Sequence, residues 1–404
     1  MKTPSTDQSK YKSLFLKSTL LLVSIMTVMS AATIAPALPL LADVFKSTPN
    51  AELLSKLVLS VPALFIALSA PFAGKFIDRY GRLNLLYFGL ILYALSGTSG
   101  YFLNNIYHIL IGRILLGVSI GITMTIAITL TGDYFEGEER KRFIGFQGAF
   151  IAMGGVVFIT IGGYLADIDW KMPFLIYGLS LFVIPLVLVF LKEPAKPFTK
   201  TQPSLEKSNG LINIVYATAV VFMILFYIIP IQLPFQLKEI GIETHSLAGI
   251  TLAINAIGAV IGSLLYSRVK QKIEFAAVFS VGFLIMAIGY LVSGLTSNFP
   301  IVIISMFIAG LGFGLILPNM NLWVIQLTKA EVRGRNMGVL TTSLFLGQFL
   351  SPLVVEPLIL IMDLSMVFSL AGGSMLLMSL AFVLLNNSKW ITNPDHYQNY
   401  SDHP

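Results

Sequence analysis

The sequence contains no cysteine. This absence excludes a disulfide framework, a metal site built on thiolates and a cysteine nucleophile. Histidine is nearly as scarce, and its four copies are scattered without forming a pair at helical spacing: His108, His245, His396 and His403. We therefore expect no metal, no other cofactor and no histidine-based catalysis.

Charged residues are also few. They make up 11% of the 404 residues, whereas hydrophobic residues make up 56%, and the mean hydropathy is +0.83. A soluble domain carries about 25% charged residues, so the chain is predicted to be an integral membrane protein. Its net charge of +6 does not indicate nucleic-acid binding, because the cations stand in small groups between apolar runs rather than on one basic face.

Long apolar runs make up most of the sequence. A membrane-spanning helix needs about 20 apolar residues, and runs separated by charge, Gly and Pro predict twelve such helices: 14–37, 53–74, 84–103, 106–132, 143–166, 172–191, 212–236, 246–267, 275–296, 299–326, 338–361 and 365–386. The first run, with Ala35-Pro36-Ala37 at its end, imitates a secretory signal. It is longer than a signal core, so we interpret it as the first helix.

The Lys and Arg residues are divided unequally between the two sides of the membrane. Only Lys46, Lys171 and Lys238 fall in the loops of one side, Lys56 and Arg113 fall within predicted spans, and all the others flank the opposite ends of the helices. The positive-inside rule therefore places both termini in the cytoplasm. The short tails and the lack of a targeting extension favour a bacterial inner membrane, and we expect a monomer.

An internal repeat divides the chain into two halves. A shift of 193 residues takes Gly117 onto Gly310 and Gly154 onto Gly347. The polar, proline-containing stretch between the sixth and seventh runs is predicted to be a linker. The predicted organisation is an N-terminal six-helix bundle over 1–191, a cytoplasmic linker over 192–210, a C-terminal six-helix bundle over 211–386 and a cytoplasmic tail over 387–404. Two parallel six-helix repeats are typical of transporters that rock about a central site.

The connection between the second and third predicted helices reads Gly74-Lys75-Phe76-Ile77-Asp78-Arg79-Tyr80-Gly81-Arg82. Taken alone, it predicts a tight loop with a charge network. A solvated basic loop would explain the cations, but neither Asp78 nor the two glycines. The segment resembles the signature loop of the major facilitator superfamily, Gly-x-x-x-Asp-Arg-x-Gly-Arg, at every defining position. With the span count, linker and repeat, the resemblance covers essentially the whole chain and implies two pseudo-symmetric six-helix bundles.

The resemblance implies a role for this segment in gating the cytoplasmic side. Gly74, Asp78, Arg79, Gly81, Arg82 and Asp133 are the residues to which it assigns that conformational role. It also implies that Asp78 faces the positive N-terminal end of the eleventh helix, near Met337 and Gly338. Arg82 is expected to pair with Asp133.

Two residues within predicted spans are candidates for proton coupling. Arg113 stands four residues before Gly117 and resembles an arginine element of the family, although Leu116 occupies a position where the family often has Gln. The alternative is that Arg113 extends to the outer surface. Glu356 is an acidic residue clearly inside a span, but it lies about 27 Å beyond Gly338 along the helix, so a structural role near the outer end is equally open.

The fifth predicted helix carries part of the antiporter signature of the family. Gly154, Gly162 and Gly163 are present, but Phe158 and Ile159 stand where Gly-Pro is expected. The sequence pattern of the second to fifth predicted helices still favours the twelve-helix drug:proton antiporter branch.

Uncharged polar residues in the spans are candidates for the substrate cavity, because unpaired amides avoid lipid: Tyr227, Gln232, Asn255, Asn319, Asn321 and Gln348. Hydrogen bonds between helices, without substrate contact, are the alternative. Pro230 and Pro234 flank Gln232, and Pro318 precedes Asn319. Interrupted helices often mark binding sites, so Gln232 and Asn319 are the preferred candidates.

The sequence thus predicts a proton-coupled transporter, not an enzyme, that exports small organic molecules by alternating access. Its partners are a small-molecule substrate, protons and the lipid bilayer. An uptake symporter or uniporter for a small nutrient is the alternative, and export of one endogenous metabolite is a variant of efflux. A membrane enzyme or receptor is disfavoured, because the spans carry no cluster of His, Asp or Glu.

Overall fold

The computed structural model describes residues 6–194, 210–329 and 332–387. The chain divides into two compact units, Met1–Phe198 (unit 1) and Thr199–Pro404 (unit 2). Every regular element in the described part is a helix, and twelve segments of it are long and apolar enough to cross a membrane. The predicted all-α membrane fold with twelve spans is confirmed. Most of the predicted linker 192–210 and of the tail 387–404 lies outside the described residues.

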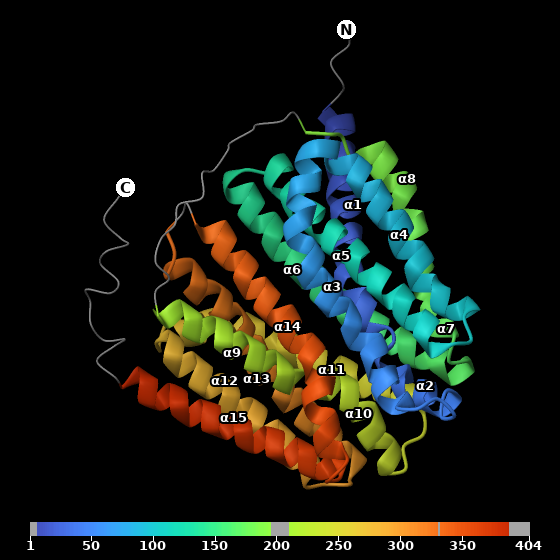
Figure 1. Cartoon of the computed structure of the whole chain (residues 1–404). Coiled ribbons are helices and arrows are strands. Elements are labelled where there is room, and N and C mark those ends of the chain that lie inside the picture. The colour runs from blue at the N-terminus through green and yellow to red at the C-terminus, as the bar shows by residue number, and fades with distance from the viewer. Residues whose placement is uncertain (1–5, 195–209, 330–331, 388–404) are drawn as a thin grey trace. The chain divides into compact units, whose positions relative to one another are not determined.

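The helices of unit 1 run from blue to green in Figure 1. They are α1 (Thr6–Ala32), η1 (Ala35–Ala37), α2 (Leu38–Val44), α3 (Ala51–Tyr80), α4 (Arg82–Phe102), α5 (Ile106–Tyr134), α6 (Gly137–Ile168), α7 (Met172–Leu175), η2 (Ile176–Leu179) and α8 (Ser180–Phe190). Two spans are composite: α1, η1 and α2 form one, and α7, η2 and α8 form another. Pro36 and Pro39 stand in the first turns of η1 and α2, where a missing backbone N–H costs little.

The helices of unit 2 run from green to red in Figure 1. They are α9 (Gly210–Phe226), α10 (Ile228–Glu239), α11 (His245–Lys270), α12 (Phe275–Gly294), α13 (Phe299–Gln326), α14 (Arg333–Ile359) and α15 (Leu364–Asn386). The pair α9 and α10 forms one span. Each of the two units therefore supplies six spans.

The internal repeat is visible in how the helices pack within each unit. A Cβ atom on Gly117 of α5 would lie 2.5 Å from the carbonyl oxygen of Pro62 in α3, and one on Gly310 of α13 would lie 2.0 Å from that of Asn255 in α11. Both distances are too short for any side chain, so each glycine permits the same close approach of two helices. The shift that pairs the two glycines also pairs Pro62 with Asn255.

The same shift relates two helix caps. The side chain of Asn105 accepts a hydrogen bond from the Tyr107 backbone N–H at the start of α5. Asn298 does so from the Ile301 N–H at the start of α13. These caps satisfy amide groups that the first helical turn leaves free.

Three helices begin five or more residues earlier than predicted. Helix α1 starts at Thr6 rather than at 14, α6 starts at Gly137 rather than at 143, and α14 starts at Arg333 rather than at 338. The added residues are mostly charged or polar. Hydropathy marks only the part of a helix that lies in hydrocarbon, whereas the helix itself continues into water where no residue breaks it.

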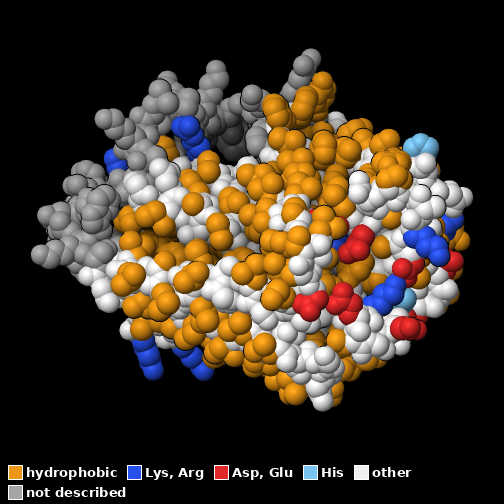
Figure 2. All heavy atoms as spheres, turned by 60° about the horizontal axis from the view of Figure 1, so that its bottom comes forward, with side chains coloured by type: hydrophobic (Ala, Val, Ile, Leu, Met, Phe, Trp, Pro, Cys, Tyr) orange, Lys and Arg blue, Asp and Glu red, His pale blue; other side chains and the backbone are white. Residues whose placement is uncertain are grey.

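Large hydrophobic side chains remain exposed along many of the helices. In the view of Figure 2 they cover much of the described surface. In a soluble protein such a surface would drive aggregation. For helices of this length, it is the surface that faces the lipid.

Candidate functional site

The segment expected to be a loop at 74–82 is mostly helical, which corrects that prediction. Helix α3 continues through Tyr80, and α4 begins at Arg82. Only Gly81 lies between them, with φ 84° and ψ 164°, a conformation that is essentially restricted to glycine. No helix-breaking residue precedes it within the segment except Gly74, so the charged end of α3 extends as a helix. The side chains of Asp78 and Arg79 and the surroundings of Gly74 lie outside the described part of the structure.

The expected ion pair between Arg82 and Asp133 is present. Arg82 Nε lies 3.0 Å from Asp133 Oδ2, and the two side chains are 11% and 18% exposed. The contact joins the start of α4 to the end of α5. Because the pair is largely shielded from water, its attraction is screened less than that of a surface pair.

Glu193 adds a carboxylate that the sequence reasoning missed. Its two oxygens accept hydrogen bonds from the backbone N–H groups of Arg82 and Leu83, both at 2.8 Å. The side chain therefore caps α4 from a segment far along the chain, at the helix end where a negative charge is favourable. The available signal was a carboxylate directly after a predicted span and before Pro194, but nothing local identified its partner.

Tyr134 holds the segment that carries Glu193. Its hydroxyl donates to the carbonyl of Lys192 and accepts from the Lys192 N–H at 3.0 Å. The end of α5 thus contributes Asp133 to Arg82 and Tyr134 to the chain beside Glu193. One end of unit 1 is held together by these contacts between α4, α5 and the segment after α8.

Arg113 lies in the interior of unit 1. The residue is 1% exposed, so the alternative that it extends to the outer surface is wrong. Its Nε donates to the carbonyl of Val58 at 2.7 Å, and its Nη2 donates to the carbonyl of Ser30 at 2.6 Å. Its Nη1 is buried without a hydrogen-bond partner among the described residues.

The energetics explain how the fold tolerates this cation. A charged side chain at the bilayer centre costs about 2.5–3.5 kcal/mol on insertion scales. A hydrogen bond from a charged donor returns about 1.5–3 kcal/mol, so the two bonds of Arg113 offset the insertion cost. They leave one strong donor, Nη1, available for a further acceptor.

Two tyrosines surround this arginine. The guanidinium carbon lies 5.1 Å from the ring centroid of Tyr177, within the range of a cation–π interaction. The Tyr177 hydroxyl donates to the same Ser30 carbonyl at 2.9 Å, and the Tyr93 hydroxyl donates to Met26 O at 2.9 Å. The two rings meet edge to face at 5.9 Å. No local sequence pattern indicates this arrangement, because its parts come from α1, α3, α4, α5 and η2.

The glycines of the partial antiporter signature pack α6 against the first span. A Cβ on Gly154 would lie 2.1 Å from Ile25 Cγ1, and one on Gly162 would lie 2.1 Å from the Thr33 carbonyl oxygen. Phe158 and Ile159, between them, are partly buried. Close packing is therefore preserved at the ends of the signature although its Gly-Pro is missing.

In unit 2, the span formed by α9 and α10 is broken at Tyr227, which is partly buried. Pro230 has no N–H with which to bond the Phe226 carbonyl. The Tyr290 hydroxyl of α12 takes over this role, since it donates to the carbonyls of Leu225 at 2.7 Å and Phe226 at 3.1 Å. The break is thus a stabilised feature of the span.

Gln232 lies just beyond this break, in α10. It is 1% exposed, and neither its amide nitrogen nor its amide oxygen has a hydrogen-bond partner among the described residues. An unpaired buried polar group costs about 1–3 kcal/mol. Gln232 therefore offers both a donor and an acceptor to another molecule.

The other predicted cavity residues of unit 2 differ from Gln232. Asn255 donates to the Met306 carbonyl at 2.8 Å, and Asn319 donates to the Phe275 carbonyl at 2.9 Å and accepts from Tyr266 at 3.2 Å. These two amides are therefore used for hydrogen bonds between helices, which is the alternative interpretation of them.

Three further candidates occupy other positions in this unit. Asn321 donates to the Leu317 carbonyl of its own helix at 3.1 Å. Gln348 is 5% exposed in α14. Glu356 is partly buried in the last turn of the same helix, so it lies near a helix end, as its spacing from Gly338 predicts.

The chain is similar to several transport and resistance proteins. A family model described as Major Facilitator Superfamily matches residues 20–352 and 215–399. The chain is 26% identical over 214 residues to the class H tetracycline resistance protein of Pasteurella multocida, a match that covers 52% of this chain and 53% of that protein. It is 24% identical over 338 residues to the class B tetracycline resistance protein of Escherichia coli, which covers 80% of this chain and 83% of that protein.

Solved structures show the same fold. A bacterial homolog to the human lysosomal transporter Spinster superposes with a TM-score of 0.72 at 17% identity and covers 100% of both chains. A D-xylose-proton symporter superposes with a TM-score of 0.73 at 15% identity and covers 91% of this chain and 97% of the other. At these identities, the likeness concerns the fold alone.

Proposed function

The chain belongs to the major facilitator superfamily, and from this premise we propose that it is a proton-coupled secondary transporter that exports small organic molecules, drug-like compounds or metabolites, by alternating access. The observation that carries the proposal is Arg113, a buried cation in a membrane span whose Nη1 has no hydrogen-bond partner among the described residues. A charge placed inside a span usually serves transport or proton movement. The similarity to two tetracycline resistance proteins supports export.

Arg113 and Glu356 divide the coupling role in this proposal. Arginine stays protonated in proteins, so Arg113 would act as a fixed positive charge that attracts an anionic or carbonyl group. Glu356 has a carboxyl group that can gain and lose a proton, so it is the candidate carrier of the coupled proton.

The ion pair of unit 1 is proposed to act in gating. Gly81, Arg82 and Asp133 lie where the start of α4 meets the end of α5, and Gly74, Asp78 and Arg79 precede Gly81 in the chain. A hydrogen-bonded charge cluster has discrete arrangements, which makes it suited to a switch between two states. The positive-inside rule supports a cytoplasmic location for this end, with both chain termini on that side.

Gln232 is our main candidate for substrate contact. Its amide has no partner in the described structure, and it lies beside a break in a span, where transporters commonly place substrate sites. Tyr227 and Gln348 remain secondary candidates. Asn255, Asn319 and Asn321 are less suited, because their amides already bond to backbone carbonyls. A bacterial inner membrane and a monomeric state complete the proposal.

Uptake by a proton symporter or a uniporter is the second candidate function. Phe158 and Ile159 replace the Gly-Pro of the antiporter signature in α6, and this departure favours a chain outside the antiporter branch.

Inside-out membrane vesicles energised with a proton gradient test the proposal. The gradient is followed with a pH-sensitive dye while tetracyclines, quinolones and a panel of metabolites are added. Wild-type vesicles should release protons on addition of a substrate. The Arg113→Lys variant keeps the charge but cannot reach the carbonyls of both Val58 and Ser30. We expect its proton release to fall about tenfold or more, and a tenfold fall corresponds to the loss of about 1.4 kcal/mol.

A control variant is Lys46→Arg, because Lys46 is exposed in a loop and this exchange of Lys and Arg likewise keeps the positive charge. Equal responses from wild type and Arg113→Lys would refute the role of Arg113. No response across the panel, together with uptake of a nutrient by whole cells, would establish the symporter or uniporter instead.

A further inference from the structure

A cavity of about 370 Å³ lies in unit 1, at the end opposite to the Arg82–Asp133 pair. It is formed where three connections meet: the one after α2, the one between α4 and α5, and the one between α6 and α7. The lining residues are Val44, Phe45, Ser47, Thr48, Asn104, Asn105, Ile106, Trp170 and Lys171. Its size falls within the range of small-molecule sites, about 300–1,000 Å³.

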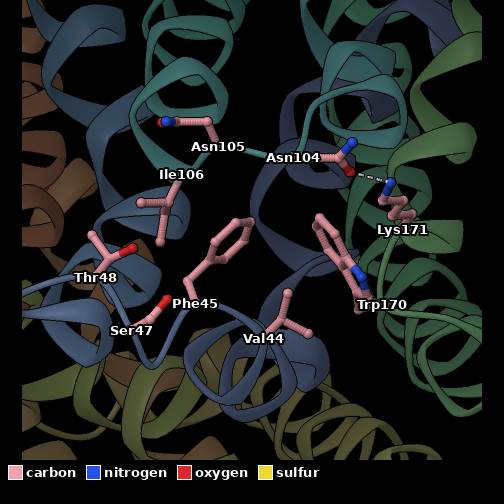
Figure 3. Close-up of a pocket in the computed structure, with 9 residues that line it drawn as sticks. All are labelled: Val44, Phe45, Ser47, Thr48, Asn104, Asn105, Ile106, Trp170 and Lys171. Atoms are coloured by element: carbon pink, nitrogen blue, oxygen red, sulfur yellow. Dashed lines mark hydrogen bonds between the residues drawn. The ribbon is translucent and has the colours of Figure 1, made fainter.

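The aromatic walls of the cavity are fixed. The rings of Phe45 and Trp170 meet edge to face with centroids 5.4 Å apart, and Figure 3 shows them side by side among the lining residues. Trp170 also packs edge to face on Phe174, at 6.4 Å. The cavity is therefore built on packed side chains.

The polar lining is rich in hydrogen-bond donors. Lys171 Nζ donates to Asn104 Oδ1 at 2.5 Å, a contact drawn in Figure 3, and it lies 5.2 Å from the Trp170 ring centroid. Because this bond uses Asn104 Oδ1, the amide nitrogen of Asn104 is the group that can donate to a ligand. An ammonium group has three donors, so Lys171 retains capacity after this bond, and Ser47 and Thr48 supply hydroxyl groups.

Among the residues that the structure describes, no carboxylate lines the cavity. The neighbouring Asp169 is bound to the Lys171 backbone N–H at 2.7 Å through Oδ1. A site with an ammonium, an amide and two hydroxyls but no acid matches an anion with several oxygen acceptors, such as a phosphate.

The surroundings identify the source of that anion. Phe102, Tyr107 and Ile168 stand close in sequence to lining residues and are 73%, 51% and 70% exposed. Exposed apolar side chains on spanning helices face acyl chains, and tryptophan is enriched at the level of lipid headgroups. A phosphate bound here would therefore have lipid tails beside it.

We propose that this cavity binds the phosphate-bearing headgroup of an anionic phospholipid, with Lys171 as its charge partner and Asn104 as a second donor. On the orientation proposed above, the lipid belongs to the outer leaflet. The site is separate from the transport machinery and does not depend on the identity of the transported substrate.

The three tryptophans of the chain, Trp170, Trp323 and Trp390, permit a direct test. Replacement of Trp323 and Trp390 by Phe leaves Trp170 as the single fluorophore. Trp323 is buried, and its Nε1 has no partner in the described part of the chain, so its replacement breaks no hydrogen bond described there. The purified full chain is titrated in detergent with short-chain phosphatidylglycerol, short-chain phosphatidylcholine or inorganic phosphate, and Trp170 emission is recorded.

We expect Trp170 emission to change in a saturable way with phosphatidylglycerol. Phosphatidylcholine should bind at least about tenfold more weakly, because its cationic choline is repelled by Lys171. Lys171→Gln should weaken phosphatidylglycerol binding about tenfold or more, because a charge-assisted hydrogen bond is lost. Lys46→Gln is the matched control, because Lys46 lies between the lining residues Phe45 and Ser47 but does not line the cavity. The affinity of this variant for phosphatidylglycerol should stay within about twofold of the wild-type value, as expected for the loss of a screened surface charge.

Several outcomes would overturn the proposal. Equal responses to the two lipids would show that the site does not require an anionic headgroup. A response to inorganic phosphate equal to that of phosphatidylglycerol would show that the site binds a free anion and not a lipid. Unchanged binding in Lys171→Gln, or equal weakening in Lys46→Gln, would remove the role of Lys171. Asn104→Asp provides a second variant, which should weaken binding by placing a carboxylate in the site, and thermal unfolding without lipid verifies that all variants fold.

Discussion

Arg113 and Tyr177 share one acceptor, the carbonyl of Ser30, and the Arg113 guanidinium carbon lies 5.1 Å from the Tyr177 ring centroid. The tyrosine therefore fixes the arginine in two ways, through its ring and through the carbonyl that both side chains bind. This leaves Nη1 as the unpaired part of the guanidinium. A fixed orientation of that donor is what a coupling role requires.

Tyr177→Phe separates these two effects. The variant keeps the ring but loses the hydrogen bond to Ser30, so it should destabilise the protein by about 1 kcal/mol, as for other hydrogen bonds between membrane helices. Tyr93→Phe is the matched control, because it loses one hydroxyl bond of the same length, to Met26, without touching the Ser30 carbonyl. Thermal unfolding in nanodiscs should show similar losses for both variants.

Only Tyr177→Phe should alter transport in the vesicle assay. Its substrate-dependent proton release should fall, because Arg113 has lost a constraint on its position. Equal transport by the two tyrosine variants would show that Tyr177 has a structural role only.

The Arg82–Asp133 pair should show a measurable coupling energy. We expect Arg82→Gln and Asp133→Asn to be non-additive by about 0.5–1 kcal/mol in unfolding experiments, since residues in one ion pair couple. Shielding of both side chains places the value near the upper end for surface pairs. The coupling should weaken only slightly in high salt. Strict additivity of the two substitutions would contradict an energetic role of the pair.

The fold was largely predictable from the sequence, because the hydrophobic runs are long and charge is confined to their ends. Runs such as 106–132 and 299–326 agree closely with α5 and α13. The misplaced ends of α3 and α6 have one physical origin. Hydropathy records the hydrocarbon thickness, so it missed the polar extension of α3 to Tyr80 and the early start of α6 at Gly137.

The candidate sites were only partly predictable. Arg113 and Gln232 could be selected because polar side chains are costly inside spans. Their environments depend on contacts between distant segments, such as Ser30 with Tyr177, which no local pattern encodes. The roles of Glu193 and Tyr290 were missed for the same reason, since both side chains bond to backbone groups of other helices.

Gly81→Ala tests the connection between α3 and α4. Gly81 has φ 84° and ψ 164°, and a Cβ there would lie 3.2 Å from Glu193 Oε1. A non-glycine residue in this region costs about 1–3 kcal/mol, so the variant should unfold more easily by that amount. Gly145→Ala is the control, because it lies in α6 with nothing within 4 Å of an added Cβ. It should gain about 0.5–1 kcal/mol, as Ala favours a helix interior. A stable Gly81→Ala variant would mean that the backbone at this connection differs from the one described.

Gln232 and Gln236 allow a comparison of two glutamines one turn apart in α10. Gln236 donates to the Ser293 carbonyl at 2.9 Å and accepts from the Ser293 hydroxyl at 3.2 Å, whereas Gln232 bonds to nothing in the described structure. Leucine at position 236 should therefore destabilise the protein by about 1–2 kcal/mol, because it leaves buried groups of Ser293 unpaired. Leucine at position 232 removes an unpaired amide, so stability should stay equal or rise by about 1 kcal/mol.

Transport should change in the opposite sense. If Gln232 contacts the substrate, Gln232→Leu will reduce substrate-dependent proton release about tenfold or more, the effect of losing about 1.4 kcal/mol of binding, in a protein that is at least as stable as wild type. Gln236→Leu should retain its transport per folded molecule. A Gln232→Leu protein that is more stable but less active than wild type would indicate that the unpaired amide is kept for function and not for folding. Full activity of Gln232→Leu would instead remove Gln232 from the substrate site.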